Sequence, residues 1–303
     1  MGKILNFWKR TKKEVSWKIF FRYGNELDIL TNYDSSFKEF ELDNKTVWAA
    51  DPLAFETSKG TFLFFELFDK KKNKGVIACS EIKNGLIDNY EVVLEEDFHL
   101  SFPFVFERNG SFYMIPETGA RKKVVLYKST NFPKDWKRES VIVDNIKSSD
   151  NIVFERNNTL FLLSSVIGST PSDCSNQLYL LNENFQVSKE ICKTAFSTDG
   201  NRNAGSIYTL KNTSIRPGQF SHNNDYGKGL CFFEFNCGEH GIQEKLIKTV
   251  LPEEIKFLAN EPFCGIHTYS WANGIEIIDA KVVKNRNILD RFKILVSRVL
   301  FKK

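Results

Sequence analysis

Short hydrophobic runs, each followed by a turn and a second hydrophobic run, recur along the chain. The clearest copies have turns near Gly60, Gly110 and Asn158, and two weaker copies have turns near Thr213 and Gly274. Such pairs of short runs are typical of β-hairpins. Successive turns are 50, 48, 55 and 61 residues apart, a spacing typical of propeller blades with four strands. The pattern predicts an all-β fold, a five-bladed β-propeller.

Further β-type runs lie between these hairpins. Residues 75–80 and 123–128 are predicted as third strands, and residues 90–94 and 140–144 as fourth strands. The propeller is expected to span residues 41–282, after a segment of residues 1–40 that contains a basic N-terminus and the first packing elements.

The carboxyl end has a different periodicity. Apolar residues fall on one face of a helix, with basic residues beside it; the apolar positions are Ile288, Leu289, Phe292, Leu295, Val296, Val299 and Leu300. Residues 283–303 are therefore expected to form a basic amphipathic helix, and residues 4–13 show the same chemistry more weakly. Such short helical ends can rest on an anionic membrane surface or dock on their own domain.

Charge is distributed unevenly along the 303 residues. Residues 1–22 contain seven basic residues and one acidic residue, and residues 281–303 contain eight basic residues and one acidic residue. The residues between them contain 27 basic and 36 acidic residues. An acidic body argues against nucleic acid as the main partner. The six cysteines form no CxxC pair and no signal peptide opens the chain, so we expect reduced thiols in the cytoplasm.

The propeller prediction also indicates where polar side chains should meet. Loops that enter the innermost strand of a blade, and loops that follow its second strand, open on one face around the central axis. Carboxylates and histidines from several blades would converge there, in a polar funnel suited to sugars. The candidates at or near such positions are Asp51, Glu66, His99, Ser101, Glu117, Asp150, Arg202 and His267.

Several motifs resemble the propeller domain at the amino end of plant glucosamine inositolphosphorylceramide transferases, which is similar to domains of bacterial surface-polysaccharide proteins. The resemblance covers roughly residues 45–280, and its motifs are VWAADP at 47–52, FFE at 64–66, FHLSFP at 98–103, YMIPE at 113–117, and Arg216-Pro217 followed by Tyr226-Gly227. The expected fold is also similar to that of arabinanases, xylosidases and invertases.

This resemblance implies roles for particular residues. An Asp-Pro in the first blade of those glycosidases acts as base or nucleophile, which implies that role for Asp51. Glu117 or Glu66 would be an acid or a hydroxyl ligand. Arg216, His99 and His267 would hold the leaving group or the sugar, and Trp48 would be a further substrate-binding residue. Where the family usually reads Arg-Pro-Ala-Gln-Asp, this chain reads RPGQF at 216–220, so one expected carboxylate is missing.

Structural interpretations of the same residues remain open. Asp51 before a proline can cap a turn, the histidines can be hydrogen-bonded at blade junctions, and Arg216 can form an ion pair between blades. The spacing of Cys231, Cys237, His240 and Cys264 matches no common zinc site, so no metal is predicted. No cofactor-binding motif is present, and no cofactor is expected.

Three functional hypotheses follow. The first is a glycosyltransferase of surface-polysaccharide or glycolipid assembly, peripheral at the cytoplasmic face of the membrane, which takes an activated sugar to a glycan or lipid-linked acceptor. The second is a non-catalytic glycan-binding or scaffolding propeller that partners a separate transferase. The third is a glycoside hydrolase, which rests on fold analogy and Asp51. We favour the first.

Overall fold

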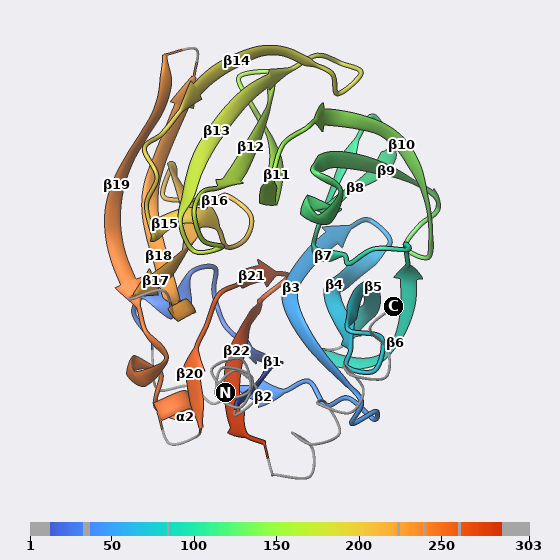
Figure 1. Cartoon of the computed structure of the whole chain (residues 1–303), viewed down its shortest axis with the longest axis vertical. Helices are drawn as coiled ribbons and strands as arrows, with labels where there is room; N and C mark the ends of the chain where they lie inside the picture. The colour runs from blue at the N-terminus through green and yellow to red at the C-terminus, as the bar shows by residue number, and fades with distance from the viewer. Residues whose placement is uncertain are drawn as a thin grey trace, which may run out of the picture.

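The chain forms five antiparallel sheets around a common axis (Figure 1). The structure is a computed structural model, and it describes residues 13–32, 37–83, 85–222, 225–238, 240–259 and 262–286. The predicted five-bladed β-propeller is confirmed. We number the blades in the order in which their innermost strands occur in the chain.

Blades 1 to 3 each contain four consecutive strands. Blade 1 has β3 (Val47–Thr57), β4 (Gly60–Asp69), β5 (Lys74–Lys83) and β6 (Leu86–Leu94). Blade 2 has β7 (Ser101–Arg108), β8 (Ser111–Glu117), β9 (Lys123–Asn131) and β10 (Asp135–Asp144). Blade 3 has β11 (Ser148–Arg156), β12 (Thr159–Ile167), β13 (Cys174–Leu181) and β14 (Val187–Lys193).

In blades 4 and 5 the innermost strand is divided into two short pieces. Blade 4 has β15 (Asp199–Asn203) and β16 (Tyr208–Leu210), both paired with β17 (Thr213–His222), then β18 (Asp225–Gly238) and β19 (Gly241–Val250). Blade 5 has β20 (Phe263–Gly265) and β21 (Tyr269–Ala272), both paired with β22 (Ile275–Asn285). Each of the five predicted turns joins the first two strands of a blade, as expected.

Blade 5 is completed by the beginning of the chain. β1 (Lys13–Tyr23) pairs antiparallel with β22 along its whole length, from Lys13 opposite Asn285 to Tyr23 opposite Ile275, and β2 (Lys38–Glu39) pairs with β1. Ile19 and Phe20 of β1 are fully buried, which is why this segment packs as a strand of the propeller.

The sequence-based boundaries are therefore corrected at both ends. Residues 13–23, which were placed before the propeller, are one of its strands. Residues 283–285, which were placed in a terminal helix, continue β22. Arg286 follows β22, and residues 287–303 of the predicted helix and the basic residues 1–12 lie outside the described residues.

Helical structure is scarce in the described part of the chain. It consists of the short turns η1 (Asp28–Leu30), η2 (Gly119–Arg121) and η3 (Pro252–Glu254), and of α2 (Lys256–Ala259). None of these helices has the length and apolar character needed to cross a membrane.

Aromatic side chains fill much of the space between neighbouring blades. Phe64 on β4 is fully buried and lies 6.0 Å, between ring centroids, from both Phe132 and Trp136 of blade 2. Burying one such ring stabilises a fold by about 1.5–3 kcal/mol. The 28 phenylalanines of the sequence thus include residues that join the sheets to one another.

Candidate functional site

The innermost strands of blades 1 to 3 are interrupted at the same level. The strand register shifts at Asp51, Phe102 and Asp150, together with the residue that follows each. Their φ angles are 52°, 43° and 47°, in the left-handed region that aspartate tolerates better than most residues. A bulge bends its strand and redirects side chains. This local geometry places the two aspartates beside the propeller axis.

A cavity of about 230 Å³ lies at this level, and we call it the axial cavity. Eight of the ten residues that the sequence singled out line it: Trp48, Asp51, Glu66, His99, Ser101, Glu117, Arg202 and His267. They come from four blades and are far apart in the sequence. Trp17, Pro171 and Tyr226 complete the lining.

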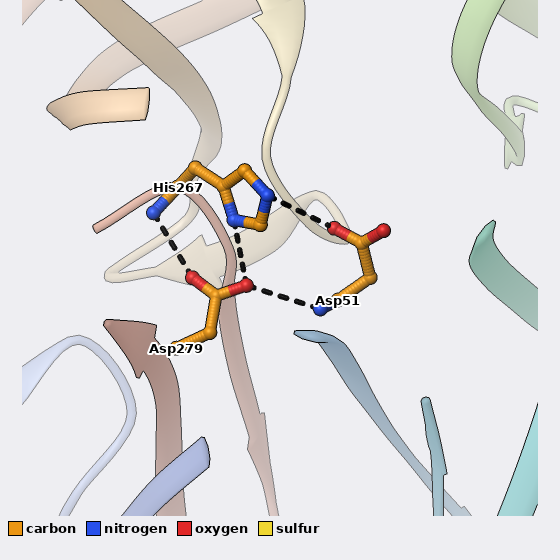
Figure 2. A group of neighbouring side chains, drawn as sticks. All are labelled: Asp51, His267 and Asp279. Atoms are coloured by element: carbon orange, nitrogen blue, oxygen red, sulfur yellow. Dashed lines mark hydrogen bonds and ion pairs between the residues drawn. The ribbon is translucent and has the colours of Figure 1, made fainter. Parts of the chain in front are cut away.

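Asp51, His267 and Asp279 form a continuous buried group (Figure 2). His267 Nδ1 lies 2.6 Å from Asp279 Oδ2, and His267 Nε2 lies 3.6 Å from Asp51 Oδ1. The Asp51 backbone N–H donates to Asp279 Oδ2 at 3.0 Å. The imidazole is thus held between two carboxylates, one on β3 and one on β22, which joins blade 1 to blade 5.

Backbone and hydroxyl donors fix the Asp51 carboxylate further. The Phe102 N–H donates to Asp51 Oδ2 at 3.1 Å, and the Thr268 hydroxyl donates to Asp51 Oδ1 at 3.0 Å. Because a carboxylate oxygen can accept two hydrogen bonds, Oδ2 keeps capacity for a ligand.

Burial dominates the protonation of this group. It raises the pKa of Asp51 to about 6, against the attraction of His267 and with the repulsion of Asp150 and Asp279. Burial lowers the pKa of His267, but the Asp279, Asp51 and Asp150 carboxylates together outweigh this effect, so that the pKa is raised. Asp51 can therefore exchange a proton near neutral pH beside His267.

Glu66 and His99 lie on the blade 1 side of the axial cavity. Burial raises the pKa of Glu66 well above its usual range, and the charges of Asp51 and Glu117 add to this, so the protonated form of Glu66 is favoured. Glu66 Oε1 is buried without a hydrogen-bond partner among the described residues, 3.5 Å from His99 Nε2. Burial lowers the pKa of His99, which accepts the Gly75 N–H at Nδ1 over 2.9 Å.

Gly75 shows how closely this part of the site is packed. A Cβ atom there would lie 2.5 Å from Glu66 Oε1 and 2.5 Å from the Leu100 carbonyl oxygen. Only glycine allows the backbone to approach both residues.

Arg202 joins two carboxylates on the opposite side. Its Nε donates to Asp150 Oδ2 at 2.5 Å, and its Nη2 donates to Glu117 Oε2 at 3.2 Å. Burial raises the pKa of Asp150 to about 6, although Arg202 opposes the shift. Asp150 lies behind Arg202, where Gln219 Nε2 also donates to it at 2.8 Å. Gln219 belongs to the RPGQF motif, so blade 4 contributes an amide at this point.

Arg216 does not line the axial cavity, which corrects its placement in the funnel. Its side chain is fully buried inside blade 4, in an ion pair with Glu244 and with a hydrogen bond from Nη2 to the Gly200 carbonyl at 2.9 Å. Arg216 therefore has the structural role that the sequence left open, as a member of an ion pair. This pair lies within blade 4 and not between two blades.

Three residues of the site escaped the sequence interpretation. The Trp17 ring stacks on His267 with centroids 3.7 Å apart, and Tyr226 meets the imidazole edge-on at 5.4 Å. Asp279 orients the same imidazole. Tyr226 stands in a family motif and could have been included on that basis. Trp17 reaches the site only because β1 pairs with β22, which no local pattern indicates, whereas Asp279 lies on β22, in the predicted hairpin around Gly274.

The described residues offer one group that could hold a metal ion, namely Asp51, His267 and Asp279, whose ligand atoms lie within 4.8 Å of one another. Both imidazole nitrogens face carboxylates at ion-pair distances. Asp279 accepts the Asp51 N–H and lies against the imidazole, and His267 lies at ion-pair distance from Asp51, so the chemistry below uses these groups without a metal.

Fold and site together define a class: a five-bladed propeller with carboxylates and histidines around its axial cavity. A family model for the N-terminal region of glucosamine inositolphosphorylceramide transferase 1 matches residues 35–256. The chain belongs to this family.

Relatives in plants agree with this assignment. The chain is 28% identical over 180 residues to glucosamine inositolphosphorylceramide transferase 1 of Oryza sativa subsp. indica, a match that covers 57% of this chain and 24% of the rice protein. It is 38% identical over 96 residues to the protein of that name from Arabidopsis thaliana, covering 31% of this chain and 12% of the relative. The match thus spans a quarter or less of either relative.

Solved structures show the same fold. A family 117 glycoside hydrolase produced by Zobellia galactanivorans superposes with a TM-score of 0.54 at 9% identity, over 88% of this chain and 90% of the hydrolase. At this identity the similarity concerns the fold alone.

Proposed function

We propose that this propeller binds a single sugar unit in the axial cavity and takes part in glycosyl transfer during the assembly of surface polysaccharide or glycolipid. The observation that carries the proposal is Asp51, a buried carboxylate oriented by Phe102 and Thr268 whose pKa of about 6 suits a general base at neutral pH. The family membership and the transferase names of the plant relatives support it.

The cavity suits a sugar ring in size and chemistry. Its volume of about 230 Å³ is below the usual range for drug-sized ligands, so one ring is a better match than an oligosaccharide. The Glu117 carboxyl group can accept hydrogen bonds from sugar hydroxyls, and Glu66, whose pKa burial raises, can donate one when it is protonated. Trp48 and Tyr226 add aromatic surface for the apolar side of the ring.

In the proposed reaction, Asp51 removes the proton from an acceptor hydroxyl as that oxygen bonds to the anomeric carbon of the donor sugar. The bond between the anomeric carbon and the leaving-group oxygen breaks, and its electron pair leaves with the leaving group. His267 and Asp279 hold Asp51 in place, and Glu66 orients the sugar through a hydroxyl group.

A membrane-surface location remains part of the proposal. It rests on the charge and periodicity of the two ends, and it would bring the axial cavity close to a lipid-linked acceptor. If the propeller only binds sugar, we propose that a separate transferase is its partner and carries out the transfer.

The test combines binding with turnover. Calorimetry with a panel of monosaccharides identifies the sugar that binds most tightly, and the release of nucleotide from its activated form in the presence of acceptor glycans measures transfer. We expect Asp51→Asn to bind this sugar within a few-fold of wild type and to lose at least about 100-fold in turnover.

Asp144→Asn is the matched control, because this aspartate is exposed at the end of β10 and, among the described residues, forms an ion pair with Lys123 and accepts the Asn145 N–H. It should leave binding and turnover unchanged. Sugar binding without any turnover would identify a glycan-binding module, and release of free sugar by water alone would identify a hydrolase. Absence of sugar binding would refute the proposal.

A further inference from the structure

A second cavity lies beside the axial cavity and has the opposite charge. It measures about 330 Å³, and four lysines with a single glutamate line it: Lys18, Lys45, Lys70, Lys284 and Glu39. We call it the lysine groove. Trp17 and Trp48 line both cavities, so the two tryptophans form the boundary between them.

The strand register places the groove within reach of a ligand in the axial cavity. Ala50 on β3 is opposite Glu66 on β4 at the level of the axial cavity, and three residues further along Val47 is opposite Asp69. Three residues of a strand span about 10 Å. Lys70 follows Asp69 directly, Lys45 lies two residues before Val47, and Lys70 Nζ donates to the Lys45 carbonyl at 3.3 Å.

Two of the lysines are available to a ligand. Lys18 pairs with Glu39 at 2.7 Å, and Lys70 lies 3.7 Å from Glu14. Lys45 and Lys284 are exposed, and no ion pair is found for either of them among the described residues. The groove therefore has uncompensated positive charge at its mouth.

The axial cavity cannot supply such charge. Arg202 already donates to Asp150 from Nε, to Glu117 from Nη2 and to the Pro171 carbonyl from Nη1. An anionic group placed among Asp51 and Glu117 would be repelled by both. A phosphate carried by the sugar would therefore be better accommodated outside the axial cavity.

We propose that the lysine groove is a phosphate subsite, which binds the phosphoryl group attached to the sugar in the axial cavity. This inference rests on the proposed function, because it presumes a sugar beyond the tryptophans. Lysine ammonium groups bind phosphate oxygens as point charges through charge-assisted hydrogen bonds. The phosphoryl group can come from an activated sugar or from the headgroup of a phospholipid.

The test compares each monosaccharide of the panel with its 1-phosphate by calorimetry at low salt, with inorganic phosphate as a further probe. We expect the phosphate to improve affinity about 10-fold, and Lys45→Gln/Lys284→Gln to abolish this gain while the affinity for the neutral sugar stays the same. Lys137→Gln/Lys189→Gln removes two exposed lysines from the outer strands of blades 2 and 3 and should retain the gain.

The outcomes separate this inference from the proposed function. If neutral sugars bind and their 1-phosphates bind no better, the phosphate subsite is refuted and the sugar site stands. If inorganic phosphate binds in a lysine-dependent way and no sugar binds, the groove stands and the proposed function fails. Uridine diphosphate sugars and phosphatidylinositol vesicles then distinguish an activated sugar from a phospholipid headgroup as the source of the phosphoryl group. Lys45→Gln/Lys284→Gln should weaken the binding of only the probe whose phosphoryl group lies in the groove.

Discussion

Asp51 occupies a conformation and an environment that both oppose the stability of the folded chain. Its backbone is left-handed, with φ at 52°, and its carboxyl group is buried beside the axis. Burial raises its pKa from 3.8 to about 6, so ionising this group costs more in the folded state than in the unfolded state. Residues that cost stability in this way are frequent at functional sites.

Replacing this carboxyl group should therefore change stability in a pH-dependent way. Because the pKa is higher in the folded state, its contribution to the free energy of unfolding falls as the pH rises through 6 and is lowest above that value. We expect the stability of Asp51→Asn relative to wild type to be about 1 kcal/mol higher at pH 7.5 than at pH 5. Urea unfolding at both pH values measures this difference. A difference that does not change with pH would show that the carboxyl group titrates normally.

At the scale of elements, the sequence predicted the hairpins, which neighbouring residues form, but not the strand pairing between distant parts of the chain. Hairpin turns such as the one at Gly60 are marked by turn residues between apolar runs, so all five were predictable. The position of β1 was not, because its partner β22 lies at the other end of the chain. The convergence of Asp51, Glu66 and His99 followed from blade geometry, whereas Arg216 looked equally suited to a site or to an internal ion pair.

The pairing of β1 with β22 predicts that a covalent link between them will stabilise the whole propeller. Val15 lies directly opposite Val283, so Val15→Cys/Val283→Cys places two thiols on facing residues. A disulfide that closes so long a loop is expected to add about 2–4 kcal/mol. Thermal unfolding with and without reductant measures the gain, and each single cysteine variant serves as the control. An oxidised double variant that melts like wild type would contradict the role of this pair in ring closure.

At the scale of the whole molecule, the folded body is acidic and the ends of the chain are basic. The lysine groove continues this segregation, since Lys284 lies one residue before the end of β22. Charge counts along the sequence showed that the ends are basic. They could not show that Lys45 and Lys70 lie beside Lys284, because that proximity depends on the packing of blade 1 against blade 5.

The basic carboxyl end predicts salt-sensitive binding to anionic membranes. Vesicles that contain phosphatidylglycerol should carry the protein upward in a flotation assay, pure phosphatidylcholine vesicles should not, and high salt should release it. Replacing Arg291, Lys293, Arg298 and Lys302 with glutamine should weaken binding roughly 1,000-fold, at about 1 kcal/mol per cation. Lys137→Gln/Lys189→Gln is the control. Equal flotation of all variants would favour docking of this segment on its own domain.

The closure of blade 5 also has a consequence for synthesis on the ribosome. β1 leaves the ribosome first, and its partner β22 follows roughly 250 residues later, which takes on the order of 10–50 s at typical elongation rates. Trp17 and His267 meet only after that interval. A nascent or prematurely terminated chain can thus form its early blades but lacks a finished axial cavity.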